Sequence, residues 1–164
     1  MNSSIEPMQT ADWEAVRAIY LEGIATRNAT FETAAPQREK WDAEHLRFGR
    51  LVARAEGSVM GWAALSAVSD RCCYAGVAEL SVYVGAAYSG RGIGTALVRA
   101  AIEVSEENGV WTLQAGIFPE NLVSLALVKK CGFREVGRRE RLGELDGVWR
   151  DVLMLERRSH AVGV

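Results

Sequence analysis

The most informative segment of the chain is residues 77–95, VAELSVYVGAAYSGRGIGT. Residues 77–84 alternate apolar and polar side chains, as in a strand with one buried face, and a helix-periodic pattern begins at Ile93. Between them, a glycine-rich loop allows backbone N–H groups to turn toward an anion at the positive end of the helix, and Arg91 adds a cation. Because G-x-G-x-G matches neither the Walker nor the dinucleotide pattern, we expect a phosphate-binding loop that takes neither ATP nor NAD.

Length and composition limit the class of protein. A chain of 164 residues fits a single domain, residues 1–164, with a core of ordinary size. A net charge of -2 argues against nucleic acid and anionic membrane surfaces as partners. The sequence contains no apolar run of about 18 residues, so it predicts no membrane span. The acidic start of the chain does not resemble a secretion signal. We therefore expect a cytoplasmic protein.

The cysteines and histidines indicate neither a disulfide framework nor a metal site. The three cysteines cannot all pair within the chain, and Cys72 and Cys73 are sequence neighbours, which disfavours a bridge between them. We therefore expect reduced thiols, with packing as their ordinary role. The sequence contains no C-x-x-C or H-E-x-x-H spacing, and the two histidines, His45 and His160, complete no triad, so no metal is expected.

Periodicity and turn signals predict a mixed order of strands and helices. The predicted strands cover residues 4–8, 51–53, 60–65, 77–84, 111–117, 133–139 and 148–155. The predicted helices cover residues 10–23, 37–48, 93–108 and 122–130, the last of them capped by Asn121. Residues 27–36 form a loop that holds Phe31 beside Glu32 and could touch a ligand, and the tail from residue 157 is expected to fray.

This order of elements resembles the GCN5-related N-acetyltransferase (GNAT) family over nearly the whole chain. Two motifs carry the resemblance, residues 79–95 and Asn121-x-x-Ser124-x-x-Leu127-x-x-x-x-Gly132-Phe133. Within the family the chain looks most like the phosphinothricin and methionine sulfoximine acetyltransferases. That finer likeness comes from the segments Ala29-Thr30-Phe31-Glu32, Arg71-x-x-Tyr74, Glu79-x-Ser81-Val82-Tyr83-Val84 and Asp146-Gly147-x-Trp149-x-Asp151.

The resemblance implies a fold and a cosubstrate. The fold is an α/β (α+β) arrangement of about seven strands in a mixed, mostly antiparallel sheet, flanked by about four helices and splayed between the fourth and fifth strands. The cosubstrate is acetyl-coenzyme A, with its pyrophosphate on the glycine loop and its pantetheine arm beside the fourth strand and the fourth helix. The implied cofactor-binding residues are Val82, Val84, Ser89, Gly90, Arg91, Gly92, Ile93, Gly94, Thr95, Asn121 and Ser124. A homodimer is also implied.

Two positions depart from the family pattern. The glycine loop of the family begins with Gln or Arg, where this chain has Ser89, so one cofactor contact is weaker while the backbone cradle is kept. The fourth helix of family members often carries Tyr or His as proton donor to the leaving thiolate, where this chain has Val128. Either another hydroxyl such as that of Tyr88 donates, or water does, or the thiolate leaves unassisted, as a thiol pKa near 8.5 allows.

Transfer to an amine requires a base, because an α-amine with a pKa of roughly 8 is mostly protonated at neutral pH. Glu79 is the predicted base, directly or through water; the alternative is a structural carboxylate at the sheet edge. The backbone N–H of Val82 could polarise the thioester carbonyl. Arg71 could bind the carboxylate or phosphinate of the acceptor, or be a surface arginine. Phe31, Glu32 and Tyr74 could line the acceptor pocket or pack structurally.

The sequence therefore predicts an N-acetyltransferase acting on the α-amine of a small amino acid or analogue, of the phosphinothricin, methionine sulfoximine or arsinothricin type. Direct attack within a ternary complex is expected, because no cysteine lies where the acetyl group should be. Two alternatives stay open: a different amine (a polyamine, an aminoglycoside or a protein N-terminus) and a non-catalytic coenzyme A-binding module, which the missing donor at Val128 would favour.

Overall fold

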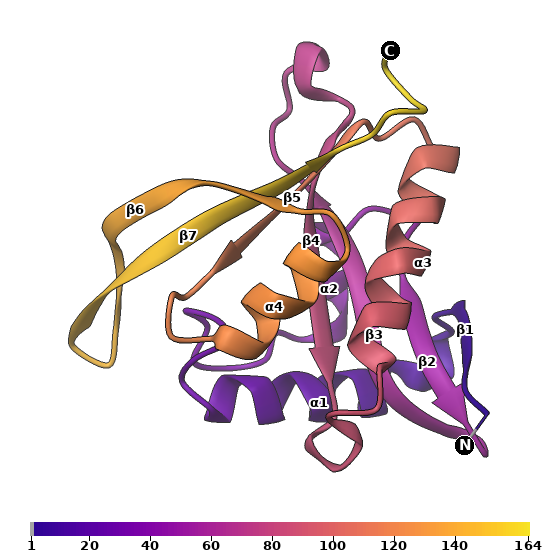
Figure 1. Ribbon diagram of the computed structural model, residues 1–164. Helices are drawn as coiled ribbons and strands as arrows, with labels where there is room; N and C mark the ends of the chain where they lie inside the picture. Colours follow the sequence, from indigo (N-terminus) through magenta and orange to yellow (C-terminus); the bar gives the residue numbers. More distant parts are fainter. Residues whose placement is uncertain (1) are drawn as a thin grey trace.

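One seven-stranded sheet, in the order β1-β2-β3-β4-β5-β7-β6, forms the centre of the computed structural model, which describes residues 2–164 (Figure 1). The strands are β1 (Ser4–Pro7), β2 (Leu51–Ala55), β3 (Ser58–Ala67), β4 (Val77–Val84), β5 (Thr112–Ile117), β6 (Arg134–Leu145) and β7 (Val148–Arg158). The helices are α1 (Trp13–Ala25), α2 (Arg38–Glu44), α3 (Ile93–Glu107) and α4 (Leu122–Lys130), with the short 3-10 turns η1 (Thr10–Asp12), η2 (Cys72–Tyr74) and η3 (Ala86–Tyr88). The fold class expected from the sequence is confirmed.

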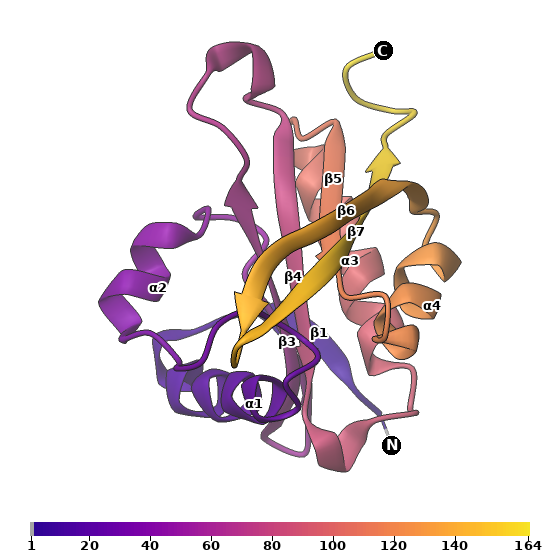
Figure 2. The same cartoon turned by 90° about the vertical axis from the view of Figure 1, so that its left-hand side faces the viewer.

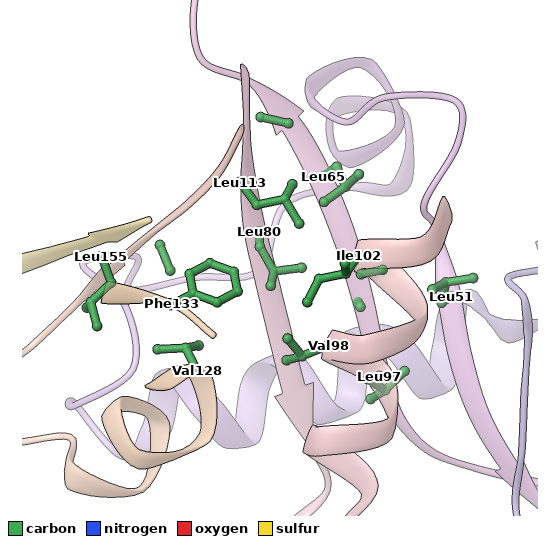
Figure 3. Close-up of a cluster of buried hydrophobic side chains, with 14 of the residues drawn as sticks. Leu51, Leu65, Leu80, Leu97, Val98, Ile102, Leu113, Val128, Phe133 and Leu155 are labelled. Carbon is green, nitrogen blue, oxygen red and sulfur yellow. The ribbon is translucent and has the colours of Figure 1, made fainter. Parts of the chain in front are cut away.

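Strand alternation divides the apolar side chains between the two faces of the sheet. On one face Leu51, Leu65 and Leu80 pack with α3 and α4 in the larger core, part of which is drawn in Figure 3. On the other face Val52 and Trp62 pack with α1 and α2 in a second core. Because successive strand residues point to opposite faces, β2 and β3 can be buried on both sides, and their near-continuous apolar sequence follows from that burial.

The sheet opens between its two parallel strands. β4 pairs with β5 only over Val77–Glu79 and Thr112–Gln114, whereas it pairs with β3 as far as Val84. β5 continues to Ile117 by pairing with β7 instead. The two strands therefore diverge beyond Glu79 and Gln114, which confirms the expected splay (Figure 1).

The turn chemistry agrees with the sequence prediction at several positions. Glu56 and Gly57, at φ +50° and +79°, make the predicted two-residue hairpin between β2 and β3. The Asn121 side chain accepts a hydrogen bond from the Ser124 backbone N–H at 3.2 Å and caps α4 as predicted. Gly132 follows α4 at φ +92°, the left-handed conformation of a helix-ending glycine.

Several predicted boundaries were wrong. β3 and β6, predicted over residues 60–65 and 133–139, extend over Ser58–Ala67 and Arg134–Leu145. The helix predicted over residues 37–48 ends at Glu44, because the backbone turns extended at His45 and the Leu46 N–H donates to the Leu65 carbonyl of β3 at 2.8 Å. The tail was expected to fray from residue 157, yet β7 continues to Arg158. Beyond it the Ser159 N–H donates to the Trp111 carbonyl at 2.8 Å, and this contact to a separate part of the chain could not be read from local sequence.

Long strands β6 and β7 form a hairpin that runs diagonally across the sheet (Figure 2). Its turn is Asp146-Gly147, at φ +51° and +80°. Gly143 of β6 lies against Phe31 of the loop after α1, where a Cβ would come within 2.9 Å of the Phe31 ring. The hairpin therefore covers one end of the region between β4 and the loop of residues 26–37.

Candidate active site

The glycine loop presents backbone amides at the beginning of α3. Gly90 and Gly92 take φ values of +75° and +77°, a conformation that costs other residues energy. The first hydrogen bond of the helix runs from the Ala96 N–H to the Gly92 carbonyl at 3.1 Å, and the N–H groups before Ala96 lack an intrahelical partner by helix geometry. A Cβ added to Gly90 or Gly92 would meet nothing within 4 Å, so the loop is open on the side where a side chain would lie.

A path leads from this loop to the open edge of β4. Gly94 lies beside Val84, with 3.6 Å between the position of an added Cβ and the Val84 side chain. The same position is 2.9 Å from Leu127, so α3 and α4 approach closely at this glycine. Beyond Glu79 the edge of β4 that faces β5 has no partner strand, and its backbone groups are available to an extended ligand.

The path ends in a cavity of about 750 Å³. Of the residues selected from the sequence, six line it: Phe31, Glu32, Glu79, Val82, Asn121 and Ser124. Asn121 and Ser124 come from the first turn of α4, while Val82 comes from the unpaired part of β4. The structure therefore brings residues from both sequence motifs, and from the loop between α1 and α2, to one cavity.

Glu79 lies at the point where β4 and β5 separate. It is exposed, and its Oε2 accepts a hydrogen bond from the Gln114 side-chain amide at 3.3 Å. Within residues 2–164 the carboxylate makes no salt bridge. A carboxylate without a cationic partner keeps the free oxygen that a general base needs.

Aromatic side chains form one wall of the cavity, and the sequence did not predict that they lie together. Tyr83 stacks on Trp62 with 4.9 Å between ring centres, and Tyr20 meets both rings edge-on at 4.9 and 5.7 Å. Burial raises the pKa of Tyr83 and, less strongly, that of Tyr20, so both phenols are neutral at physiological pH. The sequence already placed Glu79, Ser81 and Tyr83 on one face of β4. The register of β3 and β4 then pairs Tyr83 with Trp62, which the sequence alone did not show.

The loop of residues 26–37 is held in place by Arg150 of β7. The guanidinium donates to the Arg27 carbonyl at 2.9 Å and to the Asn28 side-chain oxygen at 2.8 Å, and it lies 4.1 Å from the centre of the Phe118 ring. Phe31 packs edge-on against the same Phe118 ring at 4.8 Å. Phe31 therefore both lines the cavity and packs structurally in the loop, so the two roles considered for it from the sequence are compatible.

The predicted donor-binding residues Val84 and 89–95 do not line this cavity, and three residues predicted for the acceptor or for catalysis also lie outside it. Arg71 and Tyr74 flank the exposed Cys72 and Cys73 in the connection that precedes β4, at the opposite end of that strand from the glycine loop, and the Arg71 guanidinium lies 5.4 Å from the centre of the Tyr74 ring. Tyr88 ends η3, just before the glycine loop, with the Arg91 guanidinium 5.9 Å from its ring centre. Within one chain, none of the three is placed together with Glu79.

Two other kinds of feature are absent from the described part of the chain, residues 2–164. No three or more histidine, cysteine or acidic side chains lie together in a way that could hold a metal ion. No helix in that range has the length and apolar character required to cross a membrane.

The comparison with known proteins decides the family. Residues 12–133 match the Acetyltransferase (GNAT) family. The chain belongs to this family. YwnH of Bacillus subtilis strain 168, a candidate phosphinothricin acetyltransferase, is 36% identical to this GNAT protein over 151 residues, covering 89% of this chain and 93% of YwnH. The L-methionine sulfoximine/L-methionine sulfone acetyltransferase of Pseudomonas aeruginosa PAO1 is 30% identical over 162 residues, covering 95% and 94% of the two chains.

A solved structure extends the likeness to three dimensions. The phosphinothricin acetyltransferase of the GNAT superfamily from Sinorhizobium meliloti, in complex with AcCoA, superposes on this GNAT protein with a TM-score of 0.88 and 26% identity. The match covers 99% of this chain and 91% of that one. The resemblance inferred from the sequence is thus confirmed, and the protein is an acetyl-transferring enzyme.

Proposed function

We propose that this GNAT enzyme acetylates the α-amine of a small amino-acid analogue, using acetyl-coenzyme A as donor. The observation that carries the proposal is the cavity of about 750 Å³ at the open edge of β4, with Glu79 at its rim. This volume is within the range of small-ligand sites. The names of the similar proteins refer to phosphinothricin and methionine sulfoximine and supply the acceptor class, and we add arsinothricin as a related candidate.

The residues present fit a coenzyme A donor. The loop is open at Gly90 and Gly92 on the side that a Cβ would enter, its amides suit a diphosphate, and Arg91 adds positive charge at the rim. The unpaired edge of β4 around Val82 suits the amide-rich pantetheine arm, with Asn121 and Ser124 on the facing helix. When bound, acetyl-coenzyme A supplies an activated acetyl thioester.

In the proposed reaction Glu79 removes the proton from the acceptor ammonium, directly or through water, and the free amine attacks the thioester carbon. The backbone N–H of Val82 polarises the carbonyl oxygen. The nitrogen, positively charged after the attack, gives its second proton to water, the carbon–sulfur bond breaks, and the electron pair leaves on sulfur. Val128 lines the cavity wall and cannot donate a proton, so the thiolate leaves unassisted or is protonated by water; with a thiol pKa near 8.5 this costs little.

The test is a thiol-release screen with acetyl-coenzyme A against a panel of amines. We expect turnover of L-methionine sulfoximine, phosphinothricin and arsinothricin, and much lower kcat/KM for polyamines, aminoglycosides and peptide N-termini. A higher kcat/KM for a polyamine, an aminoglycoside or a peptide N-terminus would contradict the proposed acceptor class. Calorimetry that shows coenzyme A binding without turnover of any amine would instead support a non-catalytic binding module.

We also propose that the enzyme is a homodimer, as the family resemblance suggested, and that it is cytoplasmic, as the sequence pattern suggested. Light scattering across a concentration series tests the dimer, since a constant mass of one chain would contradict it. Arg71 and Tyr74 keep their proposed acceptor role only if substitution of Arg71 raises the KM of the acceptor, because a single chain places both outside the cavity.

A further inference from the structure

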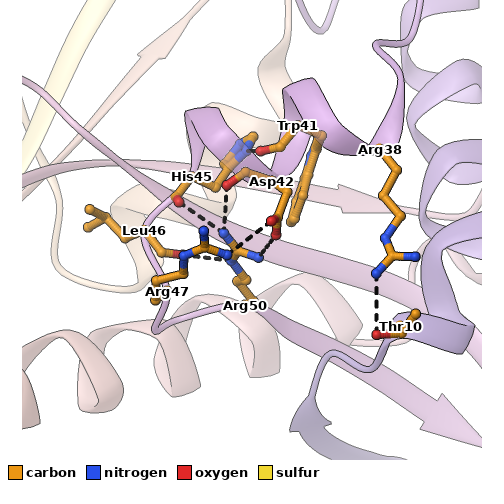
Figure 4. A network of polar contacts seen from close by, with 8 residues as sticks. All are labelled: Thr10, Arg38, Trp41, Asp42, His45, Leu46, Arg47 and Arg50. Carbon is orange, nitrogen blue, oxygen red and sulfur yellow. Dashed lines mark hydrogen bonds and ion pairs between the residues drawn. The ribbon is translucent and has the colours of Figure 1, made fainter.

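His45 occupies a fixed position at the end of α2. Its Nδ1 lies 2.6 Å from the Trp41 carbonyl oxygen, and its ring stacks on the Trp41 ring with 4.2 Å between centres (Figure 4). The next residue, Leu46, donates its N–H to the Leu65 carbonyl of β3 at 2.8 Å. Trp41 therefore positions the ring through a hydrogen bond and a stacking contact, and the Leu46 bond attaches the end of α2 to β3.

The hydrogen bond to Trp41 fixes the tautomer. A carbonyl oxygen only accepts, so Nδ1 carries the hydrogen, and in the neutral ring Nε2 is an acceptor. Burial lowers the pKa of His45, and the nearby Arg50 guanidinium acts in the same direction, while Asp42 and Glu44 of α2 oppose it less strongly. The titratable groups of the sheet that line the same cavity are Glu79 and Tyr83 of β4 and Arg139 of β6. The neutral form therefore dominates at neutral pH.

Nε2 of His45 is available to accept a hydrogen bond at the border of the cavity. His45 is one of the residues that line it, and no hydrogen bond or ion pair of the ring other than that of Nδ1 occurs within residues 2–164. The buried nitrogen atoms that lack a partner in that range are the indole Nε1 atoms of Trp41 and Trp62, so Nε2 is in contact with solvent-filled space.

His45 and Glu79 face the same hollow from different elements. The Trp41 ring packs edge-on against Trp62 at 5.8 Å, and Leu46 pairs with Leu65, so His45 is level with the end of β3. There Ser66 is the register partner of Glu79. A ligand between the end of α2 and β4 would meet a hydrogen-bond acceptor on one side and a carboxylate on the other.

We propose that His45 is a binding residue for the acceptor substrate and accepts, through Nε2, a hydrogen bond from an N–H or O–H group of the amino-acid analogue. The inference rests on the proposed function and deepens it, because it requires an acceptor with a donor group within reach of the end of α2. The role is in binding, so it affects the KM of the acceptor and leaves the KM of acetyl-coenzyme A unchanged.

Two substitutions separate this role from a structural one. The Asn amide nitrogen in His45→Asn can take the place of Nδ1, keep the bond to the Trp41 carbonyl and remove Nε2. The Gln side-chain amide in His45→Gln reaches the position of Nε2 but loses the hydrogen bond to the Trp41 carbonyl. We expect His45→Asn to raise the KM for L-methionine sulfoximine about tenfold, since one hydrogen bond to the ligand is lost. His45→Gln should retain most of the affinity, and His160→Asn serves as the control.

The reverse order, with His45→Asn unchanged and His45→Gln impaired, would overturn the inference and assign the ring to support of α2. A second readout does not depend on the variants. In the His160→Asn background His45 is the single histidine, and saturating L-methionine sulfoximine with coenzyme A should shift its Nε2 nitrogen resonance. An unmoved resonance alongside normal turnover overturns the inference alone, whereas wild-type protein without turnover of any amine overturns the proposed function and the inference with it.

Discussion

Glu79 and Gln114 are the last register partners of β4 and β5, and the Gln114 amide donates to the Glu79 carboxylate at 3.3 Å. The sheet is continuous on one side of this pair and open on the other. A carboxylate at that point is anchored by regular strand pairing while it faces the cavity. The geometry thus combines a fixed position with access to ligand, as a general base requires.

We predict that Glu79→Gln lowers kcat at pH 7 by a factor of about 100 or more, because the acceptor amine then keeps its proton. At pH 9 the amine loses its proton without help, so the loss should be much smaller. Steady-state kinetics with L-methionine sulfoximine at both pH values checks this. An equal loss at pH 7 and pH 9 would exclude Glu79 as the base.

A substitution in the glycine loop is predicted to affect selectively the KM of the donor, acetyl-coenzyme A. Gly92→Ala places a Cβ on the open side of the loop and should raise the KM of acetyl-coenzyme A about tenfold or more. The matched control is Gly109→Ala, because Gly109 has nearly the same φ of +78° and equally open surroundings. It follows the other end of the 15-residue helix α3, about 22 Å away. Both variants carry similar backbone strain of roughly 1–2 kcal/mol, and a similar KM for both would contradict a loop that binds diphosphate.

Arg150 is predicted to act on the acceptor site through the loop of residues 26–37. Arg150→Met removes the hydrogen bonds to Arg27 and Asn28 but keeps an apolar side chain over Phe118. We expect a loss of stability of about 2 kcal/mol and a KM for the acceptor several times higher, since a looser loop no longer positions Phe31 and Glu32. Denaturant unfolding and acceptor kinetics measure the two effects.

Arg134→Met is the control for Arg150→Met, because both are strand arginines with a carboxylate partner. Arg150 pairs with Glu120 at 3.2 Å and Arg134 with Glu156, yet most of the Arg134 side chain is exposed. It should change stability by less than about 1 kcal/mol. An Arg150→Met enzyme with an unchanged KM for the acceptor would show that the loop is held without Arg150.

His45 predicts a dependence of stability on pH. Its pKa in the folded state is below the ordinary value of 6.5, so the unfolded state binds a proton more readily as the pH falls below that value. The stabilising effect of the neutral ring is complete above pH 6.5 and is lost as the pH falls through the folded-state pKa. Thermal unfolding between pH 8 and pH 5 should therefore show a steeper fall of Tm for the wild type than for His45→Asn; parallel curves would contradict it.

The sequence was sufficient for the elements that depend on local chemistry. The hairpin at Glu56-Gly57, the cap of Asn121 and the glycine loop each follow from the conformations that those residues allow. The end of α2 was predicted one turn too late, because the contact that stops it, Leu46 with Leu65, joins segments far apart in the chain. The ordered tail was missed for the same reason, since Ser159 bonds to Trp111.

For the candidate site, the order of residues along the chain determined the family and led to two proposals, the phosphate-binding role of the glycine loop and Glu79 as the base, because strand alternation and glycine spacing are local properties. Tertiary structure alone decided which side chains share the cavity. It added Tyr20, Trp62 and His45, whose contacts form only when α1, α2 and β3 pack together, and it left Arg71 and Tyr74 outside. Packing between distant segments has no periodic signature in one sequence, so the acceptor end of the site became visible only in the folded chain.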